Sequence, residues 1–246
     1  MKYKKILPLM FIIILVCSQL VLAITAEEII NKRDNNQHYQ SAKVEAEMII
    51  INGDRKMTKT MQSITDGENG LTEFTNPRDR GTKFLKRGDD LFLRFPDAED
   101  IVKMSGHMLQ QSMMGSDFSY QDMMESDKLT ELYNFEILGE EEYQDHSCYK
   151  LEGIKKEGVD SSYYRRVAWV DKERFIGLKE ELYARSGRLL KETFVEEINE
   201  IDGRWFPVKT VMESKLKKNT RTIFKIDKIE FNPELEEGIF TINNLR

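Results

Sequence analysis

The sequence predicts a mostly β domain: a strongly curved antiparallel sheet, or incomplete barrel, of about ten strands, with short helices covering its concave face. Three observations predict this fold. Polar and apolar residues alternate over most of the chain, turn signals separate the alternating segments, and one helically spaced segment rich in methionine interrupts them. With 246 residues, the chain can bury a substantial core.

The first residues have the pattern of an export signal. Three lysines precede an apolar run at residues 6–22, and residues 21–23 offer a signal peptidase site. Pro8 and Gln19 weaken the run as a membrane span, but an uncleaved anchor stays an alternative. We therefore expect residues 1–23 to be a signal peptide and residues 24–246 to form a single exported domain. Cleavage removes three lysines and no acid, so the net charge changes from -6 to -9.

The composition excludes some functions. Charged residues make up 33 % of an acidic chain, so no attraction to nucleic acid is expected. Cys17 falls in the signal, and Val16 before it does not suit a lipoprotein signal. After cleavage Cys148 has no cysteine partner. The nearest histidine, His146, lies two residues away on the same face of the expected strand, but no residue in the sequence is placed to orient it. We therefore expect the Cys148 thiol to be structural rather than a nucleophile.

The first predicted elements are a helix and a hairpin. Residues 25–39 form the helix, with Thr25 as N-cap and Glu28 completing a capping box. Residues 44–50 alternate as a strand, and Asn52-Gly53 favours the tight turn to a second strand at residues 55–65. Shorter strands are expected at 71–75, 82–86 and 91–95, again separated by turn signals.

The methionine-rich segment, residues 104–124, contains six of the twelve methionines. Met104, Met108 and Gln111 have helical spacing. A break at residues 115–117 follows, and Ser119 caps a second short helix that carries Met123 and Met124. Methionine clusters either fill a core or form adaptable apolar surfaces, and composition alone leaves both open.

From residue 129 to the end, alternation returns in strands of about ten residues joined by short turns, which predicts an up-and-down meander. A sheet of this size curls, and its apolar face needs a cover. The helices can supply it and leave an internal hydrophobic cavity. We assign Phe194, Phe206, Val208 and Met212 to that sheet face.

No catalytic constellation accompanies this pattern. The nucleophile elbow, the dinucleotide and phosphate loops and the zinc motifs are missing from the sequence. His38, His107 and His146 fall in different elements without ligand spacing. We therefore expect no catalytic residues, no metal and no cofactor.

Several ordered motifs resemble one family. The segment MMGSDFSYQDMM follows the strand LFLRFP, and CYKLEG, YYRRVAWVDKE, GRLLKE, IDGRWFPVKTVMES and IFTINNLR come after it. This set resembles the outer-membrane lipoprotein-sorting proteins of the LolA-like superfamily over most of residues 40–246. The resemblance implies an exported carrier with a hydrophobic cavity for lipid or lipoprotein acyl chains.

The resemblance also implies partners. Some relatives are associated with RND-type exporters, so an inner-membrane exporter and an outer-membrane acceptor are expected, with a monomeric carrier between them. A lipid sensor or a structural envelope protein without transport is the alternative. On the carrier interpretation, a lid over the cavity is expected to contain Met108, Met113, Met114, Phe118, Met123 and Met124.

Overall fold

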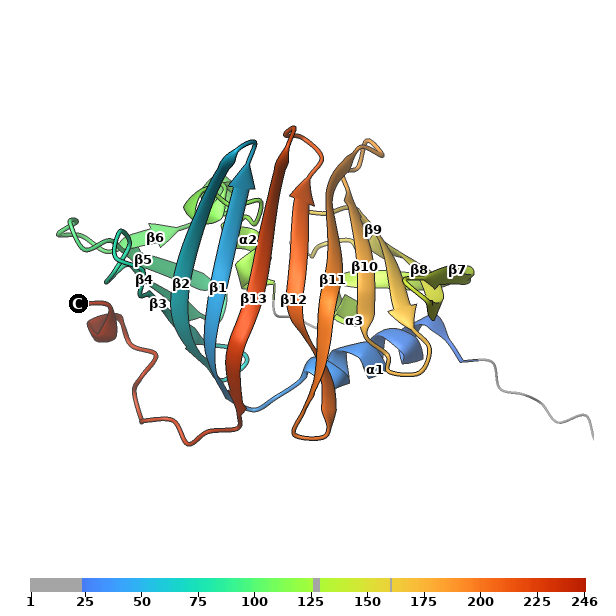
Figure 1. Ribbon diagram of the computed structural model, residues 1–246, viewed down its shortest axis with the longest axis horizontal. Coiled ribbons are helices and arrows are strands. Elements are labelled where there is room, and N and C mark those ends of the chain that lie inside the picture. The colour runs from blue at the N-terminus through green and yellow to red at the C-terminus, as the bar shows by residue number, and fades with distance from the viewer. Residues whose placement is uncertain (1–23, 126–128, 160) are drawn as a thin grey trace, which may run out of the picture.

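The computed structural model describes residues 24–125, 129–159 and 161–246, so the predicted signal peptide lies outside the described residues. These residues form one strongly curved sheet of thirteen antiparallel strands (Figure 1). The fold class predicted from the sequence is confirmed, although the sheet has more than the expected ten strands. Among the described residues, no helix has the length and apolar content that a membrane span requires.

The strands fall into two runs along the chain. The first run is β1 (Ala42–Asn52), β2 (Arg55–Thr65), β3 (Gly70–Phe74), β4 (Lys83–Arg87), β5 (Asp90–Arg94) and β6 (Val102–Met104). The second run is β7 (Tyr133–Tyr143), β8 (His146–Lys155), β9 (Arg165–Asp171), β10 (Gly177–Tyr183), β11 (Leu189–Ile201), β12 (Arg204–Ser214) and β13 (Thr220–Phe231).

The two runs join at the middle of the sheet, because β1 pairs with β13. The strand order is β6-β5-β4-β3-β2-β1-β13-β12-β11-β10-β9-β8-β7, so each run is a meander of neighbouring strands. The free edges are therefore β6 and β7, which follow one another in the sequence. The segment between them has to pass from one edge of the curved sheet to the other.

Local turn chemistry explains where the first elements begin and end. Asn52 pairs with Arg55 across a two-residue turn, and Gly53 adopts a φ of +59° that glycine tolerates. Helix α1 (Ala26–Gln37) begins at the predicted capping box, in which Thr25 accepts from the Glu28 amide and Glu28 accepts from the Thr25 amide. Both predictions are confirmed.

The methionine-rich segment is less helical than predicted. Met104 lies in β6, opposite Leu91 of β5, and so belongs to the sheet. The rest forms the 3₁₀ turns η1 (Gly106–Gln110) and η2 (Met113–Gly115) and the short helix α2 (Tyr120–Met124). Ser119 caps α2 as predicted, with Asp122 completing the box. Glycine and serine at residues 115 and 116 favour turns over a continuous helix.

Two corrections concern the segments that flank β7 and β13. Residues 129–132 were expected to start a strand but form the helix α3 (Leu129–Leu132). Beyond β13, alternation does not persist: the chain runs without strands to η3 (Ile242–Leu245), which packs beside β4 and β5 (Figure 1). Leu245 is fully buried there, and Lys83 donates to the Asn244 carbonyl at 2.9 Å. A single buried leucine anchors this tail.

Two apolar clusters cover opposite ends of the concave face. The first cluster joins β1 to β6 with the methionine-rich segment, and its largest buried side chains include Met48, Phe74 and Phe84. The second joins α1 and α3 to β7, β8 and β9 around Ile29, Ile30 and Tyr133. Helices at both ends thus leave the middle of the concave face as the place for a cavity.

Gly153 in β8 tests how tightly the edge of the sheet is packed. A Cβ at this position would lie 2.5 Å from the Phe135 ring of β7. Gly153→Ala is therefore expected to destabilise the protein by about 1–3 kcal/mol, measured by urea unfolding. Phe135→Leu in the same chain should recover part of that loss, because it removes the ring that clashes. An unchanged unfolding midpoint for Gly153→Ala would contradict the packing described.

Candidate ligand-binding cavity

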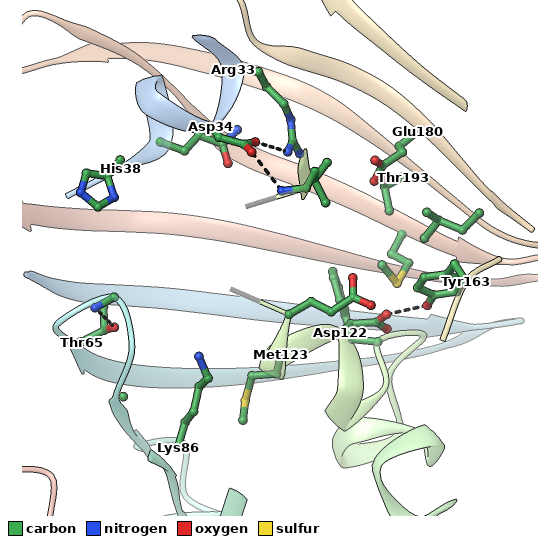
Figure 2. A pocket seen from close by; sticks show the side chains of 18 of the residues that line it. Arg33, Asp34, His38, Thr65, Lys86, Asp122, Met123, Tyr163, Glu180 and Thr193 are labelled. Carbon is green, nitrogen blue, oxygen red and sulfur yellow. Dashed lines mark hydrogen bonds and ion pairs between the residues drawn. The ribbon is translucent and has the colours of Figure 1, made fainter. Parts of the chain in front are cut away.

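A cavity of about 540 Å³ occupies the middle of the concave face. Helix α1 contributes Arg33 and Asp34 from one side, and α2 contributes Asp122 and Met123 from the other (Figure 2). Strands from both runs form its floor, so the cavity spans the junction where β1 meets β13. Its volume lies within the range of small-molecule sites in proteins.

The wall of the cavity is mixed in character. Its apolar part is formed by six side chains from five different elements and the segments beside them: Phe84, Phe118, Met123, Leu129, Leu182 and Met212. Its charged part includes Arg33, Asp34, Lys86, Asp122, Glu125, Arg166 and Glu180. The wall is thus more polar than the hydrophobic cavity predicted from the sequence. A ligand that fills it needs an apolar portion and a polar portion.

Arg166 of β9 is the centre of the charged wall. Only 5 % of the residue is exposed, and its guanidinium pairs with Glu125 and, at 3.2 Å, with Glu180 of β10. It also lies over the Tyr133 ring, 4.8 Å from the centroid. Burial lowers the pKa of Arg166, but the carboxylates of Glu180 and Glu125 raise it by more than burial lowers it. The pKa of the guanidinium is therefore raised overall, and the group stays charged.

Asp122 connects α2 to the sheet on the same side of the cavity. Its carboxylate accepts from the Tyr163 hydroxyl at 2.5 Å and pairs with Lys191 of β11 at 2.5 Å. Burial, and then the charge of Asp122, raise the pKa of Tyr163, so its phenol stays protonated and donates. Ion pairs and hydrogen bonds thus fix the position of α2 over the sheet.

This network was not predicted from the sequence, although the sequence contains one signal of it: the pair Arg165-Arg166 opens the largely apolar run of strand β9. In the structure six successive residues of that strand, Arg166–Asp171, are buried. An apolar strand covered on both faces has to bury at least one side chain of the pair Arg165-Arg166. Such an arginine requires acidic partners. The identity of the partners, Glu125 and Glu180, depends on the tertiary structure.

The predicted lid residues divide into two groups. Met123 and Phe118 line the cavity. Met113 and Met124 are buried in the first apolar cluster, and Met108 and Met114 pack against that cluster without lining the cavity. Most of the methionine-rich segment therefore fills the core beneath short turns, and α2 with the preceding loop is the part that faces the cavity.

The predicted sheet residues also separate. Met212 lines the main cavity. Val208 and Phe206 lie four and six residues before it in β12, so they point to the same face of the sheet, and both are buried. Phe194 does not share that face, because the register pairs Thr193 with Met212 and Phe194 with Val211. A shift of one residue in register moves a side chain to the other face of a sheet. The ring of Phe194 lies beneath Arg221, 5.8 Å from its guanidinium carbon, and Phe194 borders a smaller cavity beside the main one rather than the main cavity itself.

The histidine beside Cys148 does have an orienting partner, contrary to the prediction: Asp171 lies 2.7 Å from Nδ1 of His146. Cys148 is fully buried, and burial together with nearby acids raises the pKa of its thiol to about 11. A thiol with this pKa is not a nucleophile at neutral pH. His146, Cys148 and Asp171 all lie outside the lining of the cavity.

Metal ligation has no support in the described ranges, which contain no group of three or more His, Cys, Asp or Glu side chains suited to an ion. The site is therefore defined by shape, apolar surface and fixed charges. Fold and site together define a class of protein: a curved antiparallel sheet with helices on its concave face and a cavity of mixed apolar and charged lining between them.

Comparisons with known proteins agree with this class. A family model described only as an uncharacterized protein matches residues 66–246. Among solved structures, a DUF1329 family protein from Desulfovibrio piger is 26% identical with a TM-score of 0.82, covering 90% of this chain and 98% of its own. A putative outer membrane lipoprotein-sorting protein domain from Vibrio parahaemolyticus is 28% identical with a TM-score of 0.78, covering 89% and 97%.

A third solved structure, a LolA superfamily protein from Nitrosomonas europaea, is 26% identical with a TM-score of 0.76, covering 90% of this chain and 100% of its own. No curated protein sequence matches the chain. The chain belongs to the family that the matching model describes, within the LolA-like superfamily of outer-membrane lipoprotein-sorting proteins. The resemblance inferred from the sequence motifs is confirmed.

Arg166 and Arg165 offer a test of the charged wall. Arg166→Met removes a buried cation and leaves two half-buried carboxylates without their partner, so it is expected to cost about 3–5 kcal/mol of stability. Arg165→Met removes a neighbouring arginine whose partner Glu152 lies at a more exposed site, and is expected to cost less than about 1 kcal/mol. Urea unfolding of both variants measures the difference. Equal losses would contradict the central position of Arg166.

Proposed function

We propose that the protein is an exported, non-enzymatic carrier that binds the acyl chain of a lipid or lipoprotein and moves it across the periplasm towards the outer membrane. The observation that supports this most directly is the cavity of about 540 Å³, in which a strip of apolar side chains shares the wall with charged groups. The similarity to an outer membrane lipoprotein-sorting domain supports the same function.

The apolar strip is the apolar part of the lining, and its composition suits a chain of methylene groups. It consists of Phe84 of β4, Phe118, Met123 of α2, Leu129 of α3, Leu182 of β10 and Met212 of β12. Each buried methylene contributes about 0.8 kcal/mol, so several of them give useful affinity. The methionine in the strip adapts to chains of different shape, since its thioether is flexible.

The charged groups in the wall suit the polar part of an amphiphile. Arg33 and Asp34 of α1 supply one charged group in the wall, and Arg166 with Glu125 and Glu180 supplies another. Figure 2 shows Arg33, Asp34 and Glu180 around the cavity. Preorganised charges in a partly dry cavity favour one orientation of a ligand. A carrier of this kind would receive its ligand from an inner-membrane exporter of the RND type and deliver it to an outer-membrane acceptor.

Native mass spectrometry of protein purified from its own host tests the ligand class. A co-purified species with the mass of a lipid or acylated peptide is the expected result, and it is removed by delipidation. Transfer to acceptor vesicles then separates a carrier from a sensor, because only a carrier releases its ligand to the acceptor. If the purified protein carries no lipid or acylated peptide and cannot be loaded with one, the proposal is overturned.

Met123→Asp tests the assignment of the strip. A carboxylate among the apolar side chains is expected to weaken binding of a fluorescent fatty acid at least about tenfold. Met108→Asp is the matched control, because Met108 packs against the neighbouring cluster and does not line the cavity. Fluorescence titration of delipidated protein measures both. A loss of affinity that is equal in the two variants would argue against Met123 as a ligand contact.

A further inference from the structure

A second, smaller cavity of about 160 Å³ lies beside the main one, between α1 and strands β9 to β12. The two cavities have four bordering residues in common: Arg33, Gln37, Glu180 and Thr193. The two cavities are therefore neighbours that meet at these four residues. Figure 2 shows Arg33 extending from α1 on the side of the cavity where Glu180 and Thr193 lie.

Arg33 is the longest of these side chains, and local contacts fix its position. Its guanidinium donates to Asp34 at 2.9 Å, and Asp34 in turn accepts from the backbone amide of Leu129 at 3.0 Å. Beneath it, β10 has a glycine: a Cβ on Gly177 would lie 3.2 Å from Nε of Arg33. The absence of a side chain at residue 177 thus makes room for Arg33 to lie close to the sheet.

We propose that Arg33 divides a single binding channel in two, and so sets the length of the acyl chain that the protein accepts. This inference rests on the proposed function, because it assumes that the main cavity holds an acyl chain. The end of the chain would meet Arg33 at the boundary of the main cavity. Without the arginine, the chain would continue into the smaller cavity.

The smaller cavity has room for the methyl end of a chain, and apolar side chains form part of its lining beside the polar Lys179, Glu180 and Thr210. A cavity of about 150 Å³ in another protein holds a benzene molecule, so about 160 Å³ accommodates about six carbon atoms. Ala168, Val195 and Pro207 provide apolar surface along its wall. An ionised arginine side chain at the entrance is a poor neighbour for a methyl group, because its charge loses hydration when apolar atoms cover it.

The experiment measures how affinity depends on chain length. Saturated fatty acids of about 10 to about 20 carbon atoms displace a fluorescent fatty acid from delipidated protein. For wild type, affinity should rise about fourfold per added methylene up to a limiting length and then stay level. For Arg33→Ala, the limiting length should increase by up to about six carbon atoms. Arg33→Ser provides a second opening variant if the alanine variant is poorly folded.

Two further variants make the result specific. Lys32→Ala removes the neighbouring cation of α1, which is exposed and lies over Phe175, and should leave the limiting length unchanged. Thr210→Leu places a larger side chain in the smaller cavity and leaves the lining of the main cavity unchanged. In the Arg33→Ala background it should therefore return the limiting length towards that of wild type. Restoration of the shorter limit would identify the smaller cavity as the place where the added carbon atoms bind.

The failures of the two proposals can be told apart. If wild type binds fatty acids and Arg33→Ala has the same limiting length, Arg33 does not divide the channel and the present inference is wrong. If wild type binds no fatty acid of any length, the proposed carrier function is overturned, and this inference with it. A limiting length that also increases in Lys32→Ala would show a general loosening of α1 and would equally overturn the assignment to Arg33.

Discussion

The pairing of the first strand with the last is the constraint on which the rest of the structure depends. Because β1 and β13 are neighbours at the centre of the sheet, the free edges β6 and β7 are consecutive along the chain. Their connection has to cross from edge to edge, and it places α2 and α3 on the concave face. A closed barrel would instead need β6 to pair with β7, which the short β6 and the intervening helices prevent.

Burial of charge follows from this arrangement. The two apolar clusters cover the ends of the concave face, and the middle has to accommodate side chains that neither cluster covers. Arg166 and Lys191 are paired there with carboxylates supplied by the crossing segment and by β10. Hydrogen bonding between these groups offsets the cost of their desolvation, and it holds the crossing segment at a defined height above the sheet. The cavity is the space that remains beneath it.

The cavity unites features that would be contradictory in an ordinary core. Apolar side chains favour a chain of methylene groups, whereas fixed charges close by favour hydration or a polar partner. An amphiphilic ligand satisfies both requirements at once, which a purely apolar molecule does not. The main and smaller cavities differ in size and have Arg33 among their common bordering residues, which is the basis of the proposal that Arg33 limits ligand length.

The sequence by itself determined the local structure and the family. Alternation, the Asn52-Gly53 turn and the capping boxes at Thr25 and Ser119 depend on residues close together in the chain, and the structure confirms them. Only the tertiary structure decided which side chains meet. Phe194 lies opposite Val211 and not on the face of Met212, because the register that pairs Ile201 with Arg204 also places Thr193 opposite Met212. Likewise, Glu125 became a partner of Arg166 because the chain between the sheet edges folds back over β9, a long-range contact that no local pattern encodes. Glu180 reaches the same arginine from β10, the strand paired with β9.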